Sequence, residues 1–484
     1  MAISKYEHLD RRVPIKEGNI ALVQDLSKCK NCTLCRRACA NDAGVFDFYD
    51  LTTNGDKPIC IHCGQCASAC PFDSINERSE VDEVKAAIAD PNKIVVFQTA
   101  PAVRVGLGEE FGAELGTFVE GKMVTALRKL GGDYVLDTNF GADMTIMEEA
   151  SELIERVVNG AGKLPQFTSC CPGWVKFAET FYPELLPHLS TAKSPILMEA
   201  AAQKTYFAEK NGIDPKQMVT VCVTPCTAKK FEIRRPEMNA AGRYLGDEEM
   251  RDSDYCITVR ELAKWLRAEE VDFNALEDGT FDPIMGEASG GGIIFGNTGG
   301  VMEAAMRAAY EFVTKEDAPN ALIPFEEIRG LDCCREADVQ IGDKTLHVAA
   351  VHGTGNFRKF KEHMDETGKH YDFIEVMACP GGCIGGGGMP RVKVPQAKAS
   401  KEARIASLYN RDSEVKVKTS CDNPEIQQMY KEFFEKPLSH KSHELLHSDV
   451  FVDRSADLGP NGACTPETCP TSVENLKTAA ESEA

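Results

Sequence analysis

The sequence has no run of about 18 apolar residues, the length that a helix needs to cross a bilayer. Its first ten residues, MAISKYEHLD, also lack the charged and then apolar pattern of a secretory signal. Basic residues are scarce relative to acidic ones: 54 Lys and Arg stand against 75 Asp and Glu, for a net charge of −21. Such a charge opposes binding to nucleic acid or to an anionic membrane, although it also simply keeps a protein soluble. We therefore expect a cytoplasmic protein that has neither of these partners.

Signatures of nucleotide binding are missing as well. No strand–GxGxxG–helix unit occurs in the sequence. The glycine-rich run 289–300 (SGGGIIFGNTGG) opens an alanine-rich stretch, but no Lys-Ser/Thr pair closes it as in a phosphate-binding loop. The glycines can instead let the backbone approach a bulky cofactor closely.

Cysteine, by contrast, is abundant, with 20 in a chain of 484 residues. In an oxidising compartment such irregular spacing would invite mispaired disulfides, whereas clustered C-x2-C spacing in a reducing cytosol points to metal. Two consecutive runs have the form C-x2-C-x2-C-x3-C, which is the spacing of a bacterial-type ferredoxin with two 4Fe–4S clusters. The runs are Cys29, Cys32, Cys35, Cys39 and Cys60, Cys63, Cys66, Cys70.

In such ferredoxins three thiolates of a run bind one cluster, and the fourth crosses to the other. We therefore assign one cluster to Cys29, Cys32, Cys35 and Cys70, and the other to Cys60, Cys63, Cys66 and Cys39. Zinc fits poorly, because it prefers two C-x2-C pairs separated by a longer loop. His62 lies between two ligands, and we expect a satisfied or exposed side chain rather than a further ligand.

Four basic residues surround the first run although the chain is acidic overall: Lys28, Lys30, Arg36 and Arg37. This basic collar could receive an acidic electron carrier such as ferredoxin or flavodoxin. It could equally do no more than offset the negative charge of the cluster. The sequence leaves both interpretations open.

After residue 80 helix and strand patterns alternate, which indicates an α/β fold with mostly parallel sheets. We expect helices at 82–90, 122–130 and 144–158, and strands at 94–97, at 134–136 and before Thr168, Thr224, His352 and Cys379. A chain of 484 residues exceeds what one core usually supports. We therefore divide it into a ferredoxin-like domain with two 4Fe–4S clusters at 1–80, a large α/β domain at 81–455 and a polar tail at 456–484.

Three segments of the large domain place cysteines where an apolar, strand-like run meets a turn: 168–174 (TSCCPGW), 224–230 (TPCTAKK) and 377–383 (MACPGGC). They contain five cysteines, and since only one of the two adjacent thiols is expected to point to a metal, they offer four thiolates, enough for one cubane cluster. In this order the segments resemble the three signature motifs of the iron-only (FeFe) hydrogenases. The resemblance runs to about residue 454 and implies the form of that enzyme that has two accessory clusters.

The resemblance implies that a 4Fe–4S cubane is held by Cys171, Cys226, Cys379 and Cys383. Cys383 would also bridge to a diiron centre with carbonyl, cyanide and azadithiolate ligands, and the two parts form the H-cluster of that family. The implied reaction is the reversible conversion of two protons and two electrons to H2. Electrons would pass through the two accessory clusters to a ferredoxin-type carrier, and maturation proteins would supply the diiron centre.

The family also moves protons along a defined set of side chains. Cys170, adjacent to a ligand, would be the first relay and would hand protons to Glu152, Ser190 and Glu149, with Arg156 as an auxiliary member. Glu149, Glu152 and Arg156 are spaced i, i+3 and i+7 in one expected helix and so share a face. Without the resemblance this face would be interpreted as solvated surface charge.

Other residues match positions that surround the diiron centre. Lys229 would pair with a cyanide, since a buried ammonium group needs an anionic partner. Pro101 and Ala102 would present backbone to a second cyanide, and Phe295 and Met377 would line the pocket. As isolated residues, such side chains belong more often to an ordinary core.

Two positions depart from the family pattern. Thr224 stands where many relatives have methionine, and Ile196 stands where many have glutamine. Such changes at the pocket wall could alter the potential, the catalytic direction or the oxygen sensitivity, but they remove no ligand.

Two other classes of protein remain as alternatives. A non-catalytic hydrogen-sensing or cluster-assembly relative would share the fold, but such relatives usually lose the free cysteine at Cys170 or parts of the third motif. A ferredoxin fused to an unrelated reductase would leave the three later motifs unexplained.

In the tail, the C-x4-C pair Cys464 and Cys469 could bind metal, form a redox disulfide or have no function. Buried thiols are expected at the cysteines with no ligand spacing: Cys222, Cys256, Cys333, Cys334 and Cys421.

Overall fold

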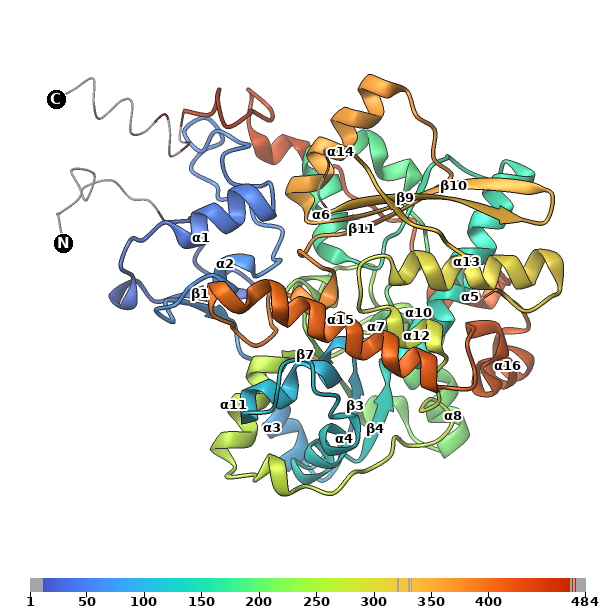
Figure 1. Cartoon of the computed structure of the whole chain (residues 1–484). Coiled ribbons are helices and arrows are strands. Elements are labelled where there is room, and N and C mark those ends of the chain that lie inside the picture. Colours follow the sequence, from blue (N-terminus) through green and yellow to red (C-terminus); the bar gives the residue numbers. More distant parts are fainter. Residues whose placement is uncertain are drawn as a thin grey trace.

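The computed structural model describes residues 12–319, 322–329, 331, 333–470, 472 and 475, so that part of the expected tail and the first 11 residues lie outside it. A small N-terminal unit sits against a larger α/β body (Figure 1). In the small unit, strands β1 (Leu22–Gln24) and β2 (Ile75–Glu77) pair antiparallel. Two one-turn helices, α1 (Leu34–Arg37) and α2 (Gln65–Ser68), each carry the third cysteine of a run. The arrangement is that expected for a two-cluster ferredoxin-like unit.

A four-stranded, fully parallel sheet forms one half of the α/β body. Its order is β4 (Tyr134–Asp137), β3 (Ile94–Thr99), β6 (Met218–Thr224), β7 (Tyr255–Thr258). These strands read as continuous apolar runs because helices cover both faces. One face packs against α3 (Val81–Ala89), α4 (Glu120–Lys129) and α11 (Val259–Ala268), and the other against α5 (Thr138–Asn159) and α7 (Pro195–Ala202).

A five-stranded sheet forms the other half, in the order β5 (Gln166–Phe167), β11 (Phe373–Met377), β10 (Lys344–His352), β9 (Cys334–Ile341), β8 (Glu326–Glu327). Its first three strands are parallel, as expected. Strands β9 and β10 instead form an antiparallel hairpin, in which Gly342 adopts a φ of 60° that suits a tight turn. The sheets are therefore mostly, but not entirely, parallel.

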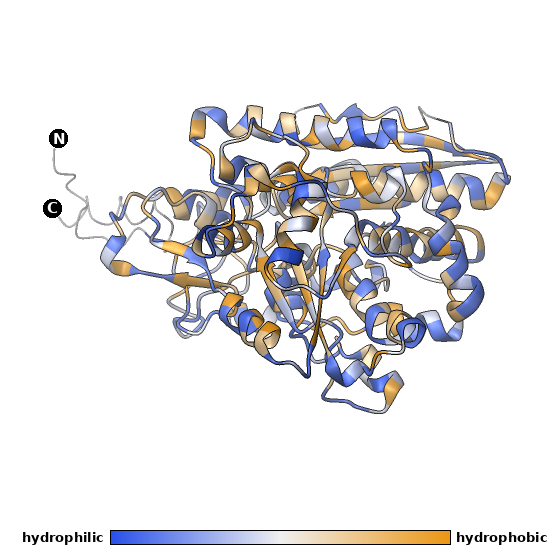
Figure 2. Ribbon diagram, turned by 90° about the horizontal axis from the view of Figure 1, so that it is seen from below, coloured by the Kyte–Doolittle hydropathy of each residue, from blue (hydrophilic) through white to orange (hydrophobic). Residues whose placement is uncertain are grey.

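The other helices complete the layers, and in Figure 2 apolar segments gather on the central strands while polar segments face outwards. They are α6 (Pro172–Phe181), α8 (Ala208–Asn211), α9 (Lys229–Glu232), α10 (Ala240–Leu245), α12 (Gly290–Ile294), α13 (Gly300–Thr314), α14 (Thr354–Thr367), α15 (Ala397–Glu414), α16 (Pro424–Met429) and α17 (His440–Leu446). In the described part of the chain, none of the helices combines the length and the apolar character that crossing a bilayer requires.

Helix α5 runs through the middle of the body and begins six residues before the expected start at 144. Asp137 caps it by accepting a hydrogen bond from the amide of Asn139. The same carboxylate accepts from the fully buried guanidinium of Arg104 at 2.7 Å. The first turns of α5 are buried on every side, so the amphipathic period that marks its later turns is absent there.

The N-terminal unit is fixed to the body through polar contacts of its second cysteine run. Arg260 of α11 donates to Glu77 of β2 at 2.7 Å and to the carbonyl oxygens of Gly387 and Met389. Glu77 is buried, which alone would raise its pKa, but Arg260 outweighs that effect and holds the pKa at about 2. Gly387 is required for the close approach, because a Cβ atom there would lie 2.2 Å from the carbonyl oxygen of Cys63.

We expect Arg260→Met to loosen this contact strongly, because it leaves the Glu77 carboxylate buried with only the more distant Lys264 nearby. Loss of one partner of a buried ion pair costs about 3–5 kcal/mol. The measurements are the thermal midpoint and the rate of proteolytic cleavage between the unit and the body. Arg267→Met is the control on the same helix, because Arg267 pairs with Glu110 at the surface and its loss should cost about 0–1 kcal/mol. Equal effects of the two variants would contradict the prediction.

Candidate active site

Four cysteines of the three motifs come together at the carboxyl ends of strands from both sheets, the edge at which sites form in α/β proteins. Cys171 follows β5 and precedes α6, Cys226 follows β6, Cys379 follows β11, and Cys383 starts a short 3-10 turn. Burial, and after it the neighbouring thiols of Cys226, Cys63, Cys171 and Cys383, raise the pKa of Cys379 well above its usual value. The expected cubane ligands are therefore mutual neighbours, although they come from separate turns.

A cavity of about 70 Å³ opens beside these thiols. Its wall is almost wholly apolar, and it contains every pocket residue expected from the sequence, including the two departures Thr224 and Ile196. The lining consists of Ala100, Pro101, Ala102, Thr138, Cys170, Cys171, Pro172, Pro195, Ile196, Thr224, Pro225, Cys226, Lys229, Phe295, Gly296, Met377 and Cys383. Four cysteines line this apolar space, three of them expected cubane ligands, and such a lining fits a bulky thiolate-bound iron cofactor.

Glycine is essential to the third motif turn that carries two of the thiols. Gly382 has a φ of 89°, in the left-handed region that L side chains rarely adopt. A Cβ atom there would lie 2.6 Å from the amide nitrogen of Thr298 and 2.8 Å from the sulfur of Met377. Only glycine lets the turn lie against both neighbours.

Lys229 has a protein anion as its partner, which the sequence analysis missed. Its ammonium group donates to the carbonyl oxygen of Cys170 at 2.9 Å and to Glu232 at 2.9 Å, and Ser194 donates to the same carboxylate at 3.0 Å. Although burial opposes it, Glu232 raises the pKa of Lys229, which stays charged. The i, i+3 spacing in the short helix α9 was the available signal.

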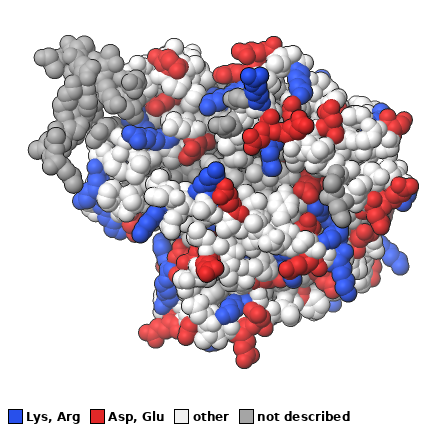
Figure 3. All heavy atoms as spheres, in the orientation of Figure 1, with Lys and Arg blue, Asp and Glu red and all other residues white. Residues whose placement is uncertain are grey.

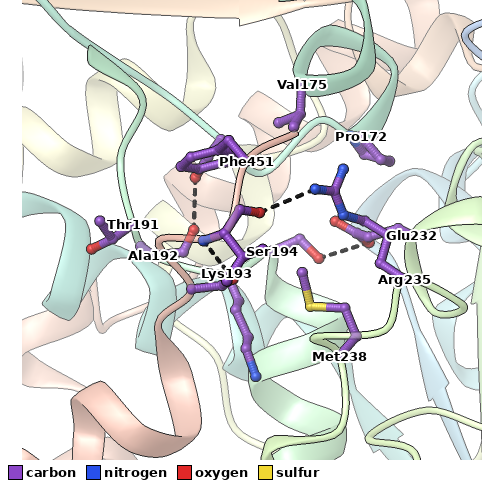
Figure 4. A pocket seen from close by; sticks show the side chains of 13 residues that line it. Pro172, Val175, Thr191, Ala192, Lys193, Ser194, Glu232, Arg235, Met238 and Phe451 are labelled. Atoms are coloured by element: carbon purple, nitrogen blue, oxygen red, sulfur yellow. Dashed lines mark hydrogen bonds between the residues drawn. The ribbon is translucent and has the colours of Figure 1, made fainter. Parts of the chain in front are cut away.

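Glu232 lines a second, smaller cavity of about 30 Å³ on the far side of the first motif (Figure 4). Figure 4 shows its bond with Ser194 and, beside it, the guanidinium of Arg235, which donates to the carbonyl oxygen of Val450. Lys229 lines the larger cavity and Glu232 the smaller one, so their ion pair spans the wall between the two.

Cys170 and the residues expected to relay protons lie near one another, and Glu149, rather than Glu152, is the carboxylate next to the thiol. Burial is the largest cause of the raised pKa of Cys170, and the charge of Glu149 is the next. Glu152 is not among the main causes. Glu152 lies further out: Ser190 donates to it at 2.8 Å and Arg156 at 2.6 Å. The structure therefore has Glu149, the earlier glutamate of α5, next to Cys170, where the sequence analysis expected Glu152.

The carboxyl group of Glu149 is shielded from solvent. It is fully buried, and neither of its side-chain oxygens has a hydrogen-bond partner among the described residues. Burial, and after it the charge of Glu152, raise its pKa to about 8. It can therefore both hold and release a proton near neutral pH.

The last cysteine of the first run, Cys39, lies beside thiols of the second run, and the assignment of all eight cysteines to two clusters stays a prediction. Cys39 is fully buried, and among its neighbours Cys63 and Cys60 act most strongly to raise its pKa after burial. Cys35 has Cys32 and Cys29 as its thiol neighbours. Cys70 is buried at the end of α2. No three His, Cys, Asp or Glu side chains of the described residues converge on a single ion, and a cubane with its thiolates at separate corners needs no such convergence.

His62 is a satisfied side chain. Its ring contacts Asn19 at 3.2 Å and Lys176 at 2.8 Å, and it stacks on Phe231. Its backbone carbonyl accepts from Thr227 at 2.6 Å, one residue after Cys226. Among the cysteines without ligand spacing, Cys333 is exposed, contrary to expectation, whereas Cys222, Cys256 and Cys334 are buried.

Comparison with known families agrees with this geometry. Residues 93–387 match the model of the iron-only hydrogenase large subunit, C-terminal domain, 398–449 match the iron hydrogenase small subunit, and 21–71 match a 4Fe-4S dicluster domain. Iron hydrogenase 1 of Clostridium pasteurianum is 44% identical over 452 residues, which cover 90% of this chain and 77% of that protein. The chain belongs to the iron-only hydrogenase family. It is an FeFe hydrogenase, and its cofactors are those of the family form with two accessory 4Fe–4S clusters and an H-cluster.

Two other hydrogenases and one assembly protein are also similar to this chain. The large subunit of a periplasmic Fe hydrogenase from Nitratidesulfovibrio vulgaris is 47% identical over 69% of this chain and 85% of its own length. The apo FeFe-hydrogenase HydA1 from Chlamydomonas reinhardtii, in a variant form, superposes with a TM-score of 0.69 at 39% identity, over 78% of this chain and all of that one. A cytosolic iron-sulfur assembly component of Bos taurus is more distant, at 29% identity over 83% of this chain.

A buried network that the sequence did not reveal supports the outer glutamate of the hydrogenase. His447 contacts Glu148 at 3.0 Å through one ring nitrogen and the hydroxyl of Thr191 at 2.8 Å through the other. The amide of Thr191 donates to both oxygens of Glu152. The histidine follows α17, almost 300 residues from the glutamates, so no local spacing could have linked them.

We expect His447→Phe to release Thr191 and misplace Glu152, which lowers the rate of H2 turnover at least about tenfold and shifts its pH profile. His447→Gln, whose amide can bond to both partners, should retain most of the rate. The infrared bands of the H-cluster should stay unchanged in both variants. His443→Gln is the control, since His443 only stacks on His447 and is exposed. A normal pH profile in His447→Phe would show that the network has no role in the proton path.

Proposed function

We propose that the two accessory clusters form a wire from the surface to the active-site cubane and that a ferredoxin or flavodoxin feeds it. Cys32 of the outer set is exposed, and Lys28, Lys30 and Arg37 are exposed around it. Lys and Arg side chains gather over this unit on the left of Figure 3, whereas acidic side chains are more frequent elsewhere on that face. This favours docking of an acidic carrier. Arg36 takes no part, because it is buried beside Asp47.

The proposal depends on one observation: the second cysteine run lies close to the thiols expected to hold the active-site cubane. Cys63 lies close enough to Cys379 to help raise the pKa of that thiol. Cys171 likewise helps to raise the pKa of Cys63. Backbone contacts through Thr227 and Gly387 hold the second run against the motif turns. Electrons would thus pass from the outer set (Cys29, Cys32, Cys35, Cys70) through the inner set (Cys60, Cys63, Cys66, Cys39) to the cubane.

We assign the H-cluster to Cys171, Cys226, Cys379 and Cys383, with Cys383 as the bridge to the diiron centre. When bound, the group supplies the redox-active Lewis acid at which H2 is formed or split. Lys229 would offer its ammonium group to a cyanide, and Pro101 and Ala102 their backbone. Phe295 and Met377 would exclude water from the remaining wall.

Protons would leave the pocket through Cys170 to Glu149, then Ser190 and Glu152, where Arg156 fixes the outer carboxylate. The thiol is buried at the cavity wall, and Glu149 titrates near neutral pH. Ser190 bonds to Glu152 and carries the step between the two glutamates. This path also weighs against a sensing or assembly role, because each member is in place.

The domain limits, the compartment and the maturation route belong to the same proposal. A ferredoxin-like domain at 1–80 and a catalytic domain at 81–455 agree with the matched ranges, and the tail follows at 456–484. Clustered cysteines favour a reducing cytoplasm, where dedicated maturation proteins would load the diiron centre. Since one relative is periplasmic, cell fractionation of the native host is the test of location.

The matured enzyme should contain about fourteen irons, from three cubanes and a diiron unit. Cys170→Ala should keep this iron and the carbonyl and cyanide infrared bands but lose H2 turnover, because the first proton relay is gone. Cys334→Ala, which removes a buried thiol elsewhere, is the control and should keep its activity. About eight irons without such bands would overturn the assignment, and near-normal turnover in Cys170→Ala would refute the relay.

The raised pKa of Glu149 predicts a pH dependence of stability. Between its unfolded value near 4.5 and its folded value of about 8, the folded chain holds a proton that the unfolded chain has released, so stability falls as the pH rises through this window. Glu149→Gln removes the titrating group and should flatten this fall, and it should also stop fast turnover. Thermal midpoints between pH 5 and pH 8 measure the effect, with Glu155→Gln on the same helix as the partly exposed control. Parallel pH curves for wild type and Glu149→Gln would contradict the predicted pKa.

A further inference from the structure

The C-terminal tail lies back on the ferredoxin-like unit, where red and blue segments meet in Figure 1. Ala463 forms an antiparallel bridge with Tyr49, and the amide of Cys464 donates to the carbonyl oxygen of Phe48 at 3.1 Å. Asn54 donates to the carbonyl oxygen of Asp457 at 3.2 Å. The tail is therefore attached at more than one point along the loop 47–54.

Two cysteines of the tail meet at this contact. The sulfur of Cys464 approaches the carbonyl oxygen of Asp47 at 3.9 Å, and that of Cys469 approaches the carbonyl oxygen of Tyr49 at 3.3 Å. One helical turn joins them, since the amide of Cys469 donates to the carbonyl oxygen of Thr465 at 2.8 Å. The two side chains lie within hydrogen-bonding reach of one another, and both are thiols in this structure.

The pair has the asymmetry of an attacking and a resolving thiol. Cys464 is partly exposed, whereas Cys469 is fully buried. A metal would need further ligands, and no third His, Cys, Asp or Glu of the described residues joins them at chelating distance. Two thiols within reach of one another can be oxidised together by two electrons to a disulfide.

The pair also lies one aromatic ring away from an accessory cluster. Tyr49 is buried. Its neighbours include two thiols of the ferredoxin-like unit, Cys39 and Cys60, and one thiol of the tail, Cys469. Tyr49 therefore connects the backbone that carries the tail to two thiols of the inner set.

We propose that Cys464 and Cys469 form a reversible disulfide by exchange with a small-molecule disulfide, which closes a loop at residues 464–469 of the tail where the tail packs on the ferredoxin-like unit beside the inner cluster. The Cys464 thiolate attacks the external disulfide and releases one thiol. Cys469 then displaces the second thiol from the mixed disulfide. One sulfur–sulfur bond breaks and one forms, and the two electrons and two protons of the pair leave with the external thiols. The link to the inner cluster rests on the proposed ligand set, but the exchange itself does not.

The test uses the complete, matured hydrogenase under anaerobic conditions with buffers of oxidised and reduced glutathione. After acid quenching and alkylation, mass spectrometry should show the tail peptide with two hydrogens fewer and no alkyl group on either cysteine. Cys222 and Cys256 are the internal control, because they are partners on β6 and β7 but fully buried, and they should stay reduced. Burial and the neighbouring Cys469 raise the pKa of Cys464 to about 12, so the exchange should accelerate about tenfold per pH unit around neutral pH.

Two variants separate the roles. Cys469→Ser should stop at a glutathione adduct on Cys464, whereas Cys464→Ser should give neither adduct nor disulfide. Oxidation should slow proteolytic release of the wild-type tail and perturb the electron paramagnetic signal of one accessory cluster, with no such effect in Cys464→Ser. A tail that stays fully reduced at every glutathione ratio, or one that retains zinc instead, would overturn the proposal. Because peptide mass is read independently of H2 turnover, such a failure is distinct from failure of the proposed function.

Discussion

The fit of the second cysteine run into the three motif turns is the contact on which the rest of this hydrogenase depends. The proposed electron transfer needs successive clusters to be close, and here the approach is made by backbone rather than by long side chains. Gly387 meets the carbonyl of Cys63, and Gly64 lies against Thr227, at distances that a Cβ atom would forbid. The buried pair of Arg260 and Glu77 then holds the two domains at that distance. Small residues set the separation, and a buried charge pair prevents it from widening.

Dryness is the second constraint, and it explains why so many charges in the body are buried in pairs. Lys229 pairs with Glu232, and Lys193 with Asp252, so each buried ammonium group has a carboxylate partner inside the protein. Glu149 has no such partner, so it stays neutral instead. The contrast separates fixed charges, which shape the field around the pocket, from a group that can change its charge. A group of the second kind is suited to take up and release a proton beside the pocket.

The sequence predicted the chemistry better than it predicted the supporting structure. Cysteine spacing and the three motifs identified the thiols, because cluster ligation tolerates few other spacings. The alternation of helices and strands gave the fold class, yet it missed the hairpin of β9 and the early start of α5. The sequence analysis also expected Glu152, rather than Glu149, next to Cys170. Spacing places residues on one face of a helix but does not say which end of that face points inwards. His447 was missed because its partners are distant in sequence, and Glu232 because two charges in one helical turn are usually surface residues.

The segment matched to a small subunit is continuous with the large one in this chain, and its contacts explain why it is needed. Arg404 of α15 donates to the carbonyl oxygen of Ile384 at 2.8 Å, next to the ligand turn at Cys383. Tyr430 and His447 close around Glu148, one residue before Glu149. The segment therefore stiffens both the thiolate cage and the helix that carries the proton path, without lining the cavity itself. Fusion makes these contacts intramolecular, so that the ligand turn and the path are fixed as soon as the chain folds.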